Sequence, residues 1–211
     1  IIKQLVLDKI PDQIVESDWS SASYFFSLVA LSDNSDLTLS SFFNKSIQGD
    51  SRIVEIYKQF GVETNYHNNK IHLKKNNIDL PDSISINLRD NPDLAQTIIV
   101  TCLGLGVDCK LEGLQTLKVK ETDRLLALKR EIEKFEVDTI AVSDQSITLK
   151  NNSKLKSGVS INTYDDHRMA MSFAPLSIIN PIFINNPEVV SKSYLNFWND
   201  LESIGFKISQ K

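Results

Sequence analysis

Three segments of the chain share one pattern, and each has an alanine near its centre: Ala22, Ala95 and Ala170. The segments read SDWSSASYFF, DNPDLAQTIIV and YDDHRMAMSF, and each is followed by a strand-like run, a charged turn and an amphipathic helix. The spacing is roughly 75 residues, and a repeat of that length and mixed content is a whole βαβ-type unit rather than a solenoid rung. The sequence therefore predicts a fold that uses one α/β unit three times.

The composition is that of an ordinary globular protein. The 211 residues are 41% hydrophobic and 24% charged, with a formal net charge of −4. This acidic balance argues against a nucleic-acid binder or a membrane-surface binder, because both need a basic face. The sequence shows neither a transmembrane run nor a signal peptide, so we expect a cytoplasmic protein.

The sequence gives no sign of a metal or nucleotide site. Cys102 and Cys109 lack metal-ligand spacing, and Cys102 lies in the apolar run TIIVTCLGLGV. We expect both to be buried thiols in a reducing compartment. A Cys/His/Asp cluster, a glycine-rich phosphate loop and a G-x-S-x-G nucleophile elbow are all missing from the sequence.

The three repeats are expected at about residues 14–73, 84–149 and 159–211. The linkers between them are short and polar, which is typical of connections within one domain. No unit of this size covers both faces of its helices alone, so the three units are predicted to form a single domain around shared helices. The predicted fold class is α/β (α+β), with the apolar helices inside and the sheets outside.

The second helix of each repeat has one apolar face, within residues 53–60, 125–135 and 194–204, where apolar side chains recur at helical spacing. After the third of these helices, residues 206–209 are expected to start a last strand. The hairpin of the other repeats is not completed there, so the chain either ends early or takes a strand from elsewhere. Because the chain begins with Ile1 rather than methionine, we expect a processed or cloned piece.

Charged residues occupy corresponding positions in different repeats. Asp93 and Arg168 stand two residues before the shared alanine, and the turns before the second helices carry Lys120, Arg124 and Lys192. These positions lie at strand ends or in first helical turns, where unpaired N–H groups and the helix dipole favour anions. The basic residues are therefore expected to converge on a site for phosphate and carboxylate groups.

Two carboxylates, Asp93 and Glu121, would lie beside these basic residues. Such a pair can serve as general base and general acid if the environments of its members differ. Two of these charged residues also have simpler explanations. Asp93 can be an ordinary carboxylate at a helix start, and Lys192 an ordinary first-turn lysine.

The two charged motifs have simpler explanations as well. Residues 120–124 can form a solvated turn in which Thr122 or Asp123 caps the next helix. Residues 166–168 can form a cap at a strand end, with His167 exposed. The residue types alone leave these alternatives open.

Two stretches, LKVKETDRLLALKREIEKF and TYDDHRMAMSFAPLSI, resemble the signature stretches of the 5-enolpyruvylshikimate-3-phosphate synthase family. ESDWSSASYFF, RDNPDLAQT and NNPEVVSKSYLNFW are also similar to that family, so the resemblance runs from about Val15 to the end. The related UDP-N-acetylglucosamine enolpyruvyl transferases share the fold but lack the pair KETDR and DHRMAM. The resemblance implies βαβαββ units arranged as a pseudo-threefold array in each of two domains.

The resemblance also implies a reaction. Phosphoenolpyruvate and shikimate 3-phosphate give enolpyruvylshikimate 3-phosphate and inorganic phosphate, a step of the shikimate pathway to aromatic amino acids and chorismate. No metal or organic cofactor takes part.

The family's functional residues carry over to matching positions of this sequence. Asp93 matches the carboxylate that contacts the shikimate hydroxyls and accepts a proton, and Glu121 matches the proton donor to the enolpyruvyl methylene. Lys120 matches a contact to shikimate 3-phosphate. The resemblance assigns the remaining positions to the phosphoenolpyruvate clamp or its surroundings: Arg124, Arg168, Lys192 and the adjacent His167.

The sequence departs from the family in two respects. Thr116 stands near the position of an asparagine that helps to hold shikimate 3-phosphate. The chain also has about half of the family's length, and the N-terminal domain with its Ser-Ser-Gln, Lys and Arg ligands is missing. We expect a half-site with little or no turnover alone, whose partner is that missing domain.

Two other functions stay open from the sequence. The first is a non-catalytic anion-binding module with the same fold, which would have no use for Asp93 and Glu121 in a basic pocket. The second is an enolpyruvyl transferase for another acceptor.

Overall fold

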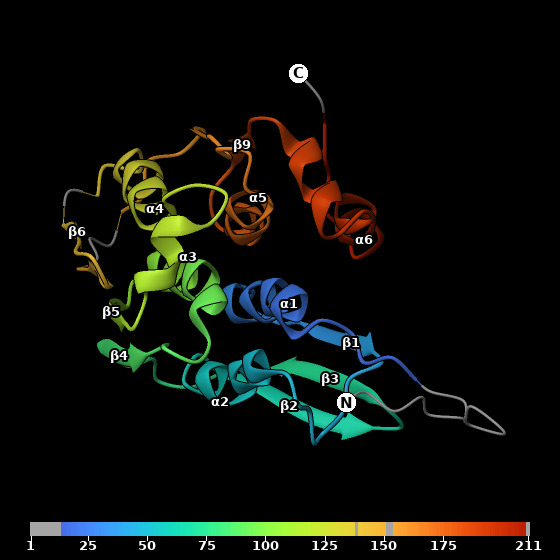
Figure 1. Cartoon of the computed structure of the whole chain (residues 1–211). Helices are drawn as coiled ribbons and strands as arrows, with labels where there is room; N and C mark the ends of the chain where they lie inside the picture. The colour runs from blue at the N-terminus through green and yellow to red at the C-terminus, as the bar shows by residue number, and fades with distance from the viewer. Residues whose placement is uncertain (1–13, 138, 151–153, 210–211) are drawn as a thin grey trace, which may run out of the picture.

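The computed structural model describes residues 14–137, 139–150 and 154–209. Three apolar helices lie together at the centre of these residues, and three sheets lie outside them (Figure 1). The central helices are α1 (Trp19–Leu31), α3 (Ala95–Leu105) and α5 (His167–Phe173). This arrangement agrees with the predicted α/β class.

The central helices are buried on nearly all sides because their sequences are apolar all round. Every residue of α1 except Ser21 is buried. The side chain of Asp18 caps this helix by accepting hydrogen bonds from the backbone N–H groups of Ser20 (3.2 Å) and Ser21 (2.9 Å). Helix α3 ends at Gly106, which adopts the left-handed conformation (φ 74°) common at helix ends.

Hydroxyl groups pair with one another where the central helices meet. Thr97 Oγ1 of α3 lies 3.0 Å from Ser23 Oγ of α1 and 3.5 Å from Ser172 Oγ of α5. One turn further along α3, Thr101 Oγ1 donates to Ser27 Oγ (2.7 Å). These contacts satisfy polar groups that would otherwise be costly to bury. A Cβ on Gly104 would lie only 2.5 Å from Leu31 Cδ2, so glycine permits the close approach of α1 and α3.

The sheets follow the repeats. The first contains β1 (Asp36–Ser40), β2 (Val62–His67) and β3 (Lys70–Lys75), all antiparallel in the order β1-β3-β2. The second has the order β4-β5-β7-β6, and its strands are β4 (Ser83–Asn87), β5 (Asp108–Glu112), β6 (Ile140–Val142) and β7 (Ser146–Leu149). The third pairs β8 (Val159–Ile161) with β9 (Ile182–Ile184) in parallel.

Shorter helices connect the strands. The second helices of the three repeats are α2 (Ile53–Lys58), α4 (Arg124–Glu133) and α6 (Phe197–Ser203). Five 3₁₀ helices occur in the described ranges: η1 (Gly49–Arg52), η2 (Pro92–Leu94), η3 (Gln115–Val119), η4 (Ala174–Ile178) and η5 (Pro187–Lys192). The expected apolar faces of α2 and α4 are buried. In the third repeat, Phe197 and Leu201 are buried, whereas Ile204 is 39% exposed.

The strand expected at residues 206–209 is not formed, so this prediction was wrong. The second sheet shows the physical reason. There, β6 is held by β7, and β7 in turn is held by β5. The described part of the third sheet has no counterpart of β7, and a strand cannot persist without a neighbour to take its backbone hydrogen bonds.

Both cysteines are buried, as expected. Burial raises the pKa of the Cys102 thiol well above its usual range, so this sulfur stays protonated at neutral pH. Among the described residues, no helix has both the length and the apolar character needed to cross a membrane.

Candidate active site

The starts of three helices bring charged side chains to one place. Asp93 lies in η2, which leads directly into α3, and Arg124 is the first residue of α4. Asp166 is the N-cap of α5, and Arg168 is in the first turn of that helix. Because the first N–H groups of a helix have no partner within it, such starts attract carboxylates and other anions.

Arg124 is the centre of the cluster. It is only 1% exposed, and its guanidinium contacts three carboxylates. Its Nε donates to Asp166 Oδ2 (2.6 Å), its Nη1 to Asp93 Oδ1 (2.9 Å) and its Nη2 to Glu121 Oε2 (2.6 Å). The sequence motifs that contain Glu121 and Asp166 are thereby joined through one buried side chain. A guanidinium is suited to this role because its donors form a rigid planar fork.

Asp166 is fully buried and has two functions. Its Oδ1 accepts the backbone N–H of Arg168 (2.8 Å), which caps α5, while its carboxylate forms an ion pair with Arg124. The alternative explanation of residues 166–168, a cap at a strand end with His167 exposed, was therefore wrong: Asp166 caps the start of α5, and the His167 side chain is only 12% exposed. A buried carboxylate requires such partners, since an unpaired charge in the interior is strongly unfavourable.

Arg168 lies beside Asp93 on the other side of the cluster. Its Nη2 is 3.2 Å from Asp93 Oδ2, and its Nη1 donates to the hydroxyl of Tyr24 (3.4 Å). Burial would lower the pKa of Arg168, but Tyr24, Asp93, Asp50 and Asp18 together raise it above its usual value. Burial also raises the pKa of Tyr24 to about 12, so this hydroxyl remains protonated.

Asp93 connects the second and third repeats. Besides Arg124 and Arg168, its carboxylate faces Lys120, whose Nζ is 3.6 Å from Asp93 Oδ1. The side chains of Asp93 and Lys120 are 26% and 36% exposed, so both are accessible from solvent. Three basic side chains therefore converge on one accessible carboxylate.

Glu121 and His167 lie next to each other beside Arg124. Burial raises the pKa of Glu121, but its own backbone N–H, Arg124, His167 and Arg168 outweigh that effect and bring the pKa below its usual value. His167 Nδ1 is 4.0 Å from Glu121 Oε1. Burial and the charge of Arg168 lower the pKa of His167. At neutral pH, Glu121 is therefore ionised and His167 is neutral.

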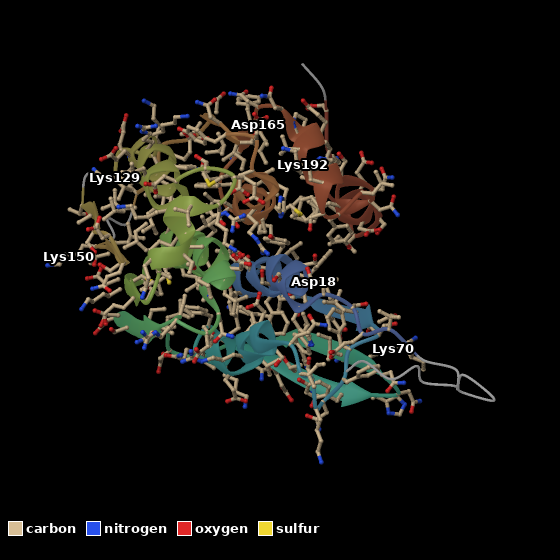
Figure 2. The ribbon with its side chains drawn as sticks, in the orientation of Figure 1. Asp18, Lys70, Lys129, Lys150, Asp165 and Lys192 are labelled. Carbon is tan, nitrogen blue, oxygen red and sulfur yellow. The ribbon has the colours of Figure 1, made fainter. Side chains whose placement is uncertain are left out.

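Two of the residues selected from the sequence lie apart from this network. Lys192, at the end of η5, donates from Nζ to the backbone carbonyl of Asp165 (2.8 Å). Figure 2 labels both residues in the upper part of the view. The ammonium is thus one residue away from Asp166. Thr116 is exposed on η3, and among the described residues it makes no hydrogen bond to the cluster.

The first repeat contributes differently from the other two. Ser20 occupies the position equivalent to Asp93 and Arg168, and its hydroxyl donates to Asp50 in η1. Burial raises the pKa of Asp50, although Ser20 and Arg168 act in the opposite direction. Arg168 therefore faces an acidic edge that comes from the first repeat.

Sequence reasoning missed two members of the site, Asp166 and Tyr24. A signal for Asp166 was present, because it is the first residue of the DHRMAM motif, and an aspartate directly before a helix caps that helix and can accept an arginine. Tyr24 lies one helical turn after Ser20 in α1, and this spacing places both on the same side of the helix. The sequence offered no sign that this side faces Arg168.

The cluster can bind an external anion by exchange of partners. Arg168 and Lys120 contact a partly exposed Asp93, and an entering phosphate or carboxylate would compete with that side chain for them. Arg124 is fixed by its three carboxylates, so its position does not depend on a ligand. Charges held in place in this manner provide electrostatic preorganisation.

Comparison with known proteins gives consistent matches. The family model described as EPSP synthase (3-phosphoshikimate 1-carboxyvinyltransferase) matches residues 8–201. A 3-phosphoshikimate 1-carboxyvinyltransferase of Bacteroides fragilis is 45% identical over 197 residues, which are 92% of this chain and 48% of that protein. The enzyme of the same name from Methanocaldococcus jannaschii is 35% identical over 209 residues, or 95% of this chain and 46% of that protein.

Solved structures show the same fold. EPSP synthase from Acinetobacter baumannii matches with a TM-score of 0.69 and 24% identity, over 93% of this chain and 48% of that one. The enolpyruvyl transferase NikO from Streptomyces tendae matches with a TM-score of 0.65 and 12% identity, over 92% of this chain and 44% of that one. The chain spans about half the length of the curated relatives that it matches.

Proposed function

The chain belongs to the EPSP synthase family, and we propose that it is the phosphoenolpyruvate-clamping half of a 3-phosphoshikimate 1-carboxyvinyltransferase. The observation that carries this proposal is the network in which Asp93 contacts both Arg124 and Arg168. It joins the KETDR and DHRMAM segments in space, and places a carboxylate among basic side chains at an accessible surface.

The proposed reaction transfers the enolpyruvyl group to the 5-hydroxyl of shikimate 3-phosphate. The hydroxyl oxygen attacks C2 of phosphoenolpyruvate while C3 gains a proton, which gives a tetrahedral intermediate. This intermediate then loses inorganic phosphate, and loss of a proton from C3 restores the double bond. The protein's task is to hold two anionic substrates and to move protons.

In this proposal Arg168 and Lys192 hold phosphoenolpyruvate, and Lys120 holds shikimate 3-phosphate. Arg124 would join the phosphoenolpyruvate clamp only by giving up one of its three carboxylates. Arg168 is well placed to exchange Asp93 for a substrate anion, because that ion pair is at 3.2 Å and Asp93 is partly exposed. Lys192 would move from the carbonyl of Asp165 to the substrate. Thr116 would complete the shikimate 3-phosphate site only as a peripheral contact, since it is exposed on η3.

Asp93 would accept the proton of the attacking hydroxyl, and Glu121 would donate a proton to C3. Because the pKa of Glu121 is lowered in the ligand-free protein, it must gain a proton before it can donate one. An adjacent polyanionic substrate favours this, since a nearby negative charge raises the pKa of a carboxyl group. His167 is neutral, and its Nδ1 would have to move closer than the present 4.0 Å from Glu121 Oε1 to pass a proton to it.

The partner of this half-site would be the other half of the enzyme. The chain covers about half of its relatives, and the cluster opens to solvent at Asp93 and Lys120. We therefore propose that the isolated chain binds phosphoenolpyruvate weakly and turns over little or not at all.

The test is a titration of the isotopically labelled chain with phosphoenolpyruvate, followed by the NMR signals of arginine Nε–Hε groups and of lysine side chains. Saturable shifts of Arg168 and Lys192 are expected, and Arg168→Ala should abolish saturation at Lys192. The matched control is Arg89→Ala, which removes an exposed arginine outside the cluster. A folded chain without saturable shifts, or shifts that persist in Arg168→Ala, would contradict the proposal.

A further inference from the structure

A second buried carboxylate lies on α4, away from the cluster described above. Glu131 is 0% exposed, and its carboxylate has partners on both oxygens. Oε2 accepts the backbone N–H of Asn162 (2.9 Å) and contacts Lys134 Nζ, while Oε1 accepts the hydroxyl of Tyr164 (2.6 Å). Lys134 Nζ also donates to the carbonyl of Ser160 (2.9 Å), so the contacts concentrate on the end of β8 and the residues after it.

Packing alone does not require a carboxylate at this position. Aligning Phe60 of the first repeat with Phe135 of the second places Ile56 opposite Glu131, and Ile56 is buried with 3% exposure. The first repeat therefore fills the equivalent position with an apolar side chain. A buried charge is costly without partners, so its presence in the second repeat calls for a specific role.

The segment that Glu131 binds has an unfavourable backbone conformation. Tyr164 and Asp165 both have positive φ angles, 53° and 55°. Residues other than glycine rarely adopt this conformation, and two in succession persist only where surrounding contacts enforce them. The next residues along the chain are Asp166, which pairs with Arg124, and Arg168, which faces Asp93.

Two side chains of helix α4, Glu131 and Arg124, bind this segment. Glu131 lies seven residues after Arg124, about two helical turns or roughly 10 Å along the same face. Glu131 binds Asn162 before the left-handed turn and Tyr164 within it, and Arg124 binds Asp166 after it. The two contacts enclose the residues with positive φ and fix where α5 begins.

We propose that Glu131 is a positioning residue of the anion site: it holds residues 162–165 in the conformation that places Asp166 and Arg168. The identity of the anion rests on the proposed function, whereas the positioning does not. The contact from Lys192 to the carbonyl of Asp165 belongs to the same segment, so Glu131 also sets the distance between Lys192 and Arg168.

The test is amide hydrogen exchange at residue level in Glu131→Gln, which keeps the shape of the side chain and removes its charge. The backbone N–H of Asp166 donates to the Thr163 carbonyl (2.9 Å) and that of Arg168 to Asp166 (2.8 Å), so both report on the segment. Their protection should fall about tenfold or more, as expected for loss of a charge-assisted hydrogen bond. Protection of Ile98 in α3 should not change.

Glu133→Gln is the matched control, because Glu133 lies on the same helix, is 42% exposed and pairs only with Lys129 in the described structure. It should leave the exchange of Asp166 and Arg168 unchanged. Tyr164→Phe removes the hydroxyl that donates to Glu131 and should lower the protection of both amides about threefold. This milder variant decides the question if Glu131→Gln does not fold.

Unchanged protection of Asp166 and Arg168 would overturn the proposal, and so would an equal loss of protection throughout α1 and α3. Titration with phosphoenolpyruvate separates this result from the proposed function. If the segment loosens in Glu131→Gln but the unmodified chain does not bind phosphoenolpyruvate, the positioning role stands and the proposed function fails. If the unmodified chain and Glu131→Gln bind equally well with equal protection, the reverse holds.

Discussion

The two arginines of the site differ in how firmly the fold holds them. Arg124 is 1% exposed and pairs with three carboxylates at 2.6 to 2.9 Å. The Arg168 side chain is 13% exposed, and its contacts to Asp93 and Tyr24 are longer, at 3.2 and 3.4 Å. The same chemical group is thus held firmly by carboxylates in the second repeat and more loosely in the third.

This difference shows how a repeat fold can give different roles to the starts of its helices. Each helix start offers a similar backbone environment, but the side chains decide how completely its charges are paired within the protein. Arg124 orders Asp93, Glu121 and Asp166 before any ligand arrives. Arg168 then needs to give up only one carboxylate to bind an anion.

The largest expected effect comes from Arg124→Ala. It leaves Asp166 buried without its ion-pair partner, and breaking a buried pair in this way costs about 3–5 kcal/mol. Urea unfolding should therefore show a lower free energy of unfolding by that amount. A loss below about 1 kcal/mol, typical of an exposed ion pair, would mean that Arg124 is not the structural centre.

Arg168→Ala should lower activity strongly and stability only slightly. Asp93 keeps Arg124 and Lys120 as partners, so the free energy of unfolding should fall by only about 1 kcal/mol, the net worth of an ordinary hydrogen bond. Activity measured together with the missing half should fall roughly 100-fold or more, as is common when a preorganised charge is removed. If Arg168→Ala lowers the free energy of unfolding as much as Arg124→Ala, the two arginines do not differ in how firmly the fold holds them.

A smaller effect is expected from Glu121 at acid pH. Its pKa in the folded protein is below the ordinary value of 4.5. Its contribution to stability is therefore complete above pH 4.5 and is lost as the pH falls through the lower folded value. The free energy of unfolding from pH 6 down to pH 3 should decline less steeply in Glu121→Gln than in the unmodified chain. Parallel curves would show that Glu121 does not pair with Arg124 in solution.

The smallest expected effect concerns His167. Burial and Arg168 lower its pKa below the ordinary 6.5, so its ring should be neutral at pH 7. Its NMR titration should have a midpoint below 6.5, and Arg168→Ala should raise that midpoint because one nearby positive charge is gone. A midpoint above 6.5 would instead indicate that Glu121 dominates the environment of this ring.

Much of the fold could be predicted because its signals are local. The apolar part of the segment SDWSSASYFF lies within α1, and Asn68 and Asn69, a residue pair typical of hairpin turns, adopt positive φ angles between β2 and β3. The strand at residues 206–209 could not be judged in the same way. Its formation depends on a neighbouring strand, which no local pattern can report.

The site was predictable to a lesser extent. Equivalent positions in the repeats led to Asp93 and Arg168, which contact each other, and the KETDR motif led to Arg124. Asp166 escaped assignment because its residue type and position already had an explanation as a cap at a strand end. Glu131 and Tyr24 act across the interfaces between repeats, and a contact of that kind depends on how three units pack together.

The most direct test of the proposed function is inorganic phosphate release from phosphoenolpyruvate and shikimate 3-phosphate. The chain would be mixed with the N-terminal half of the Bacteroides fragilis relative, with each half alone and the Arg168→Ala chain as controls. We predict release that requires both halves and is lost in Arg168→Ala. If halves shown to be folded and associated release no phosphate, the account is contradicted, and a non-catalytic anion-binding module becomes the better explanation.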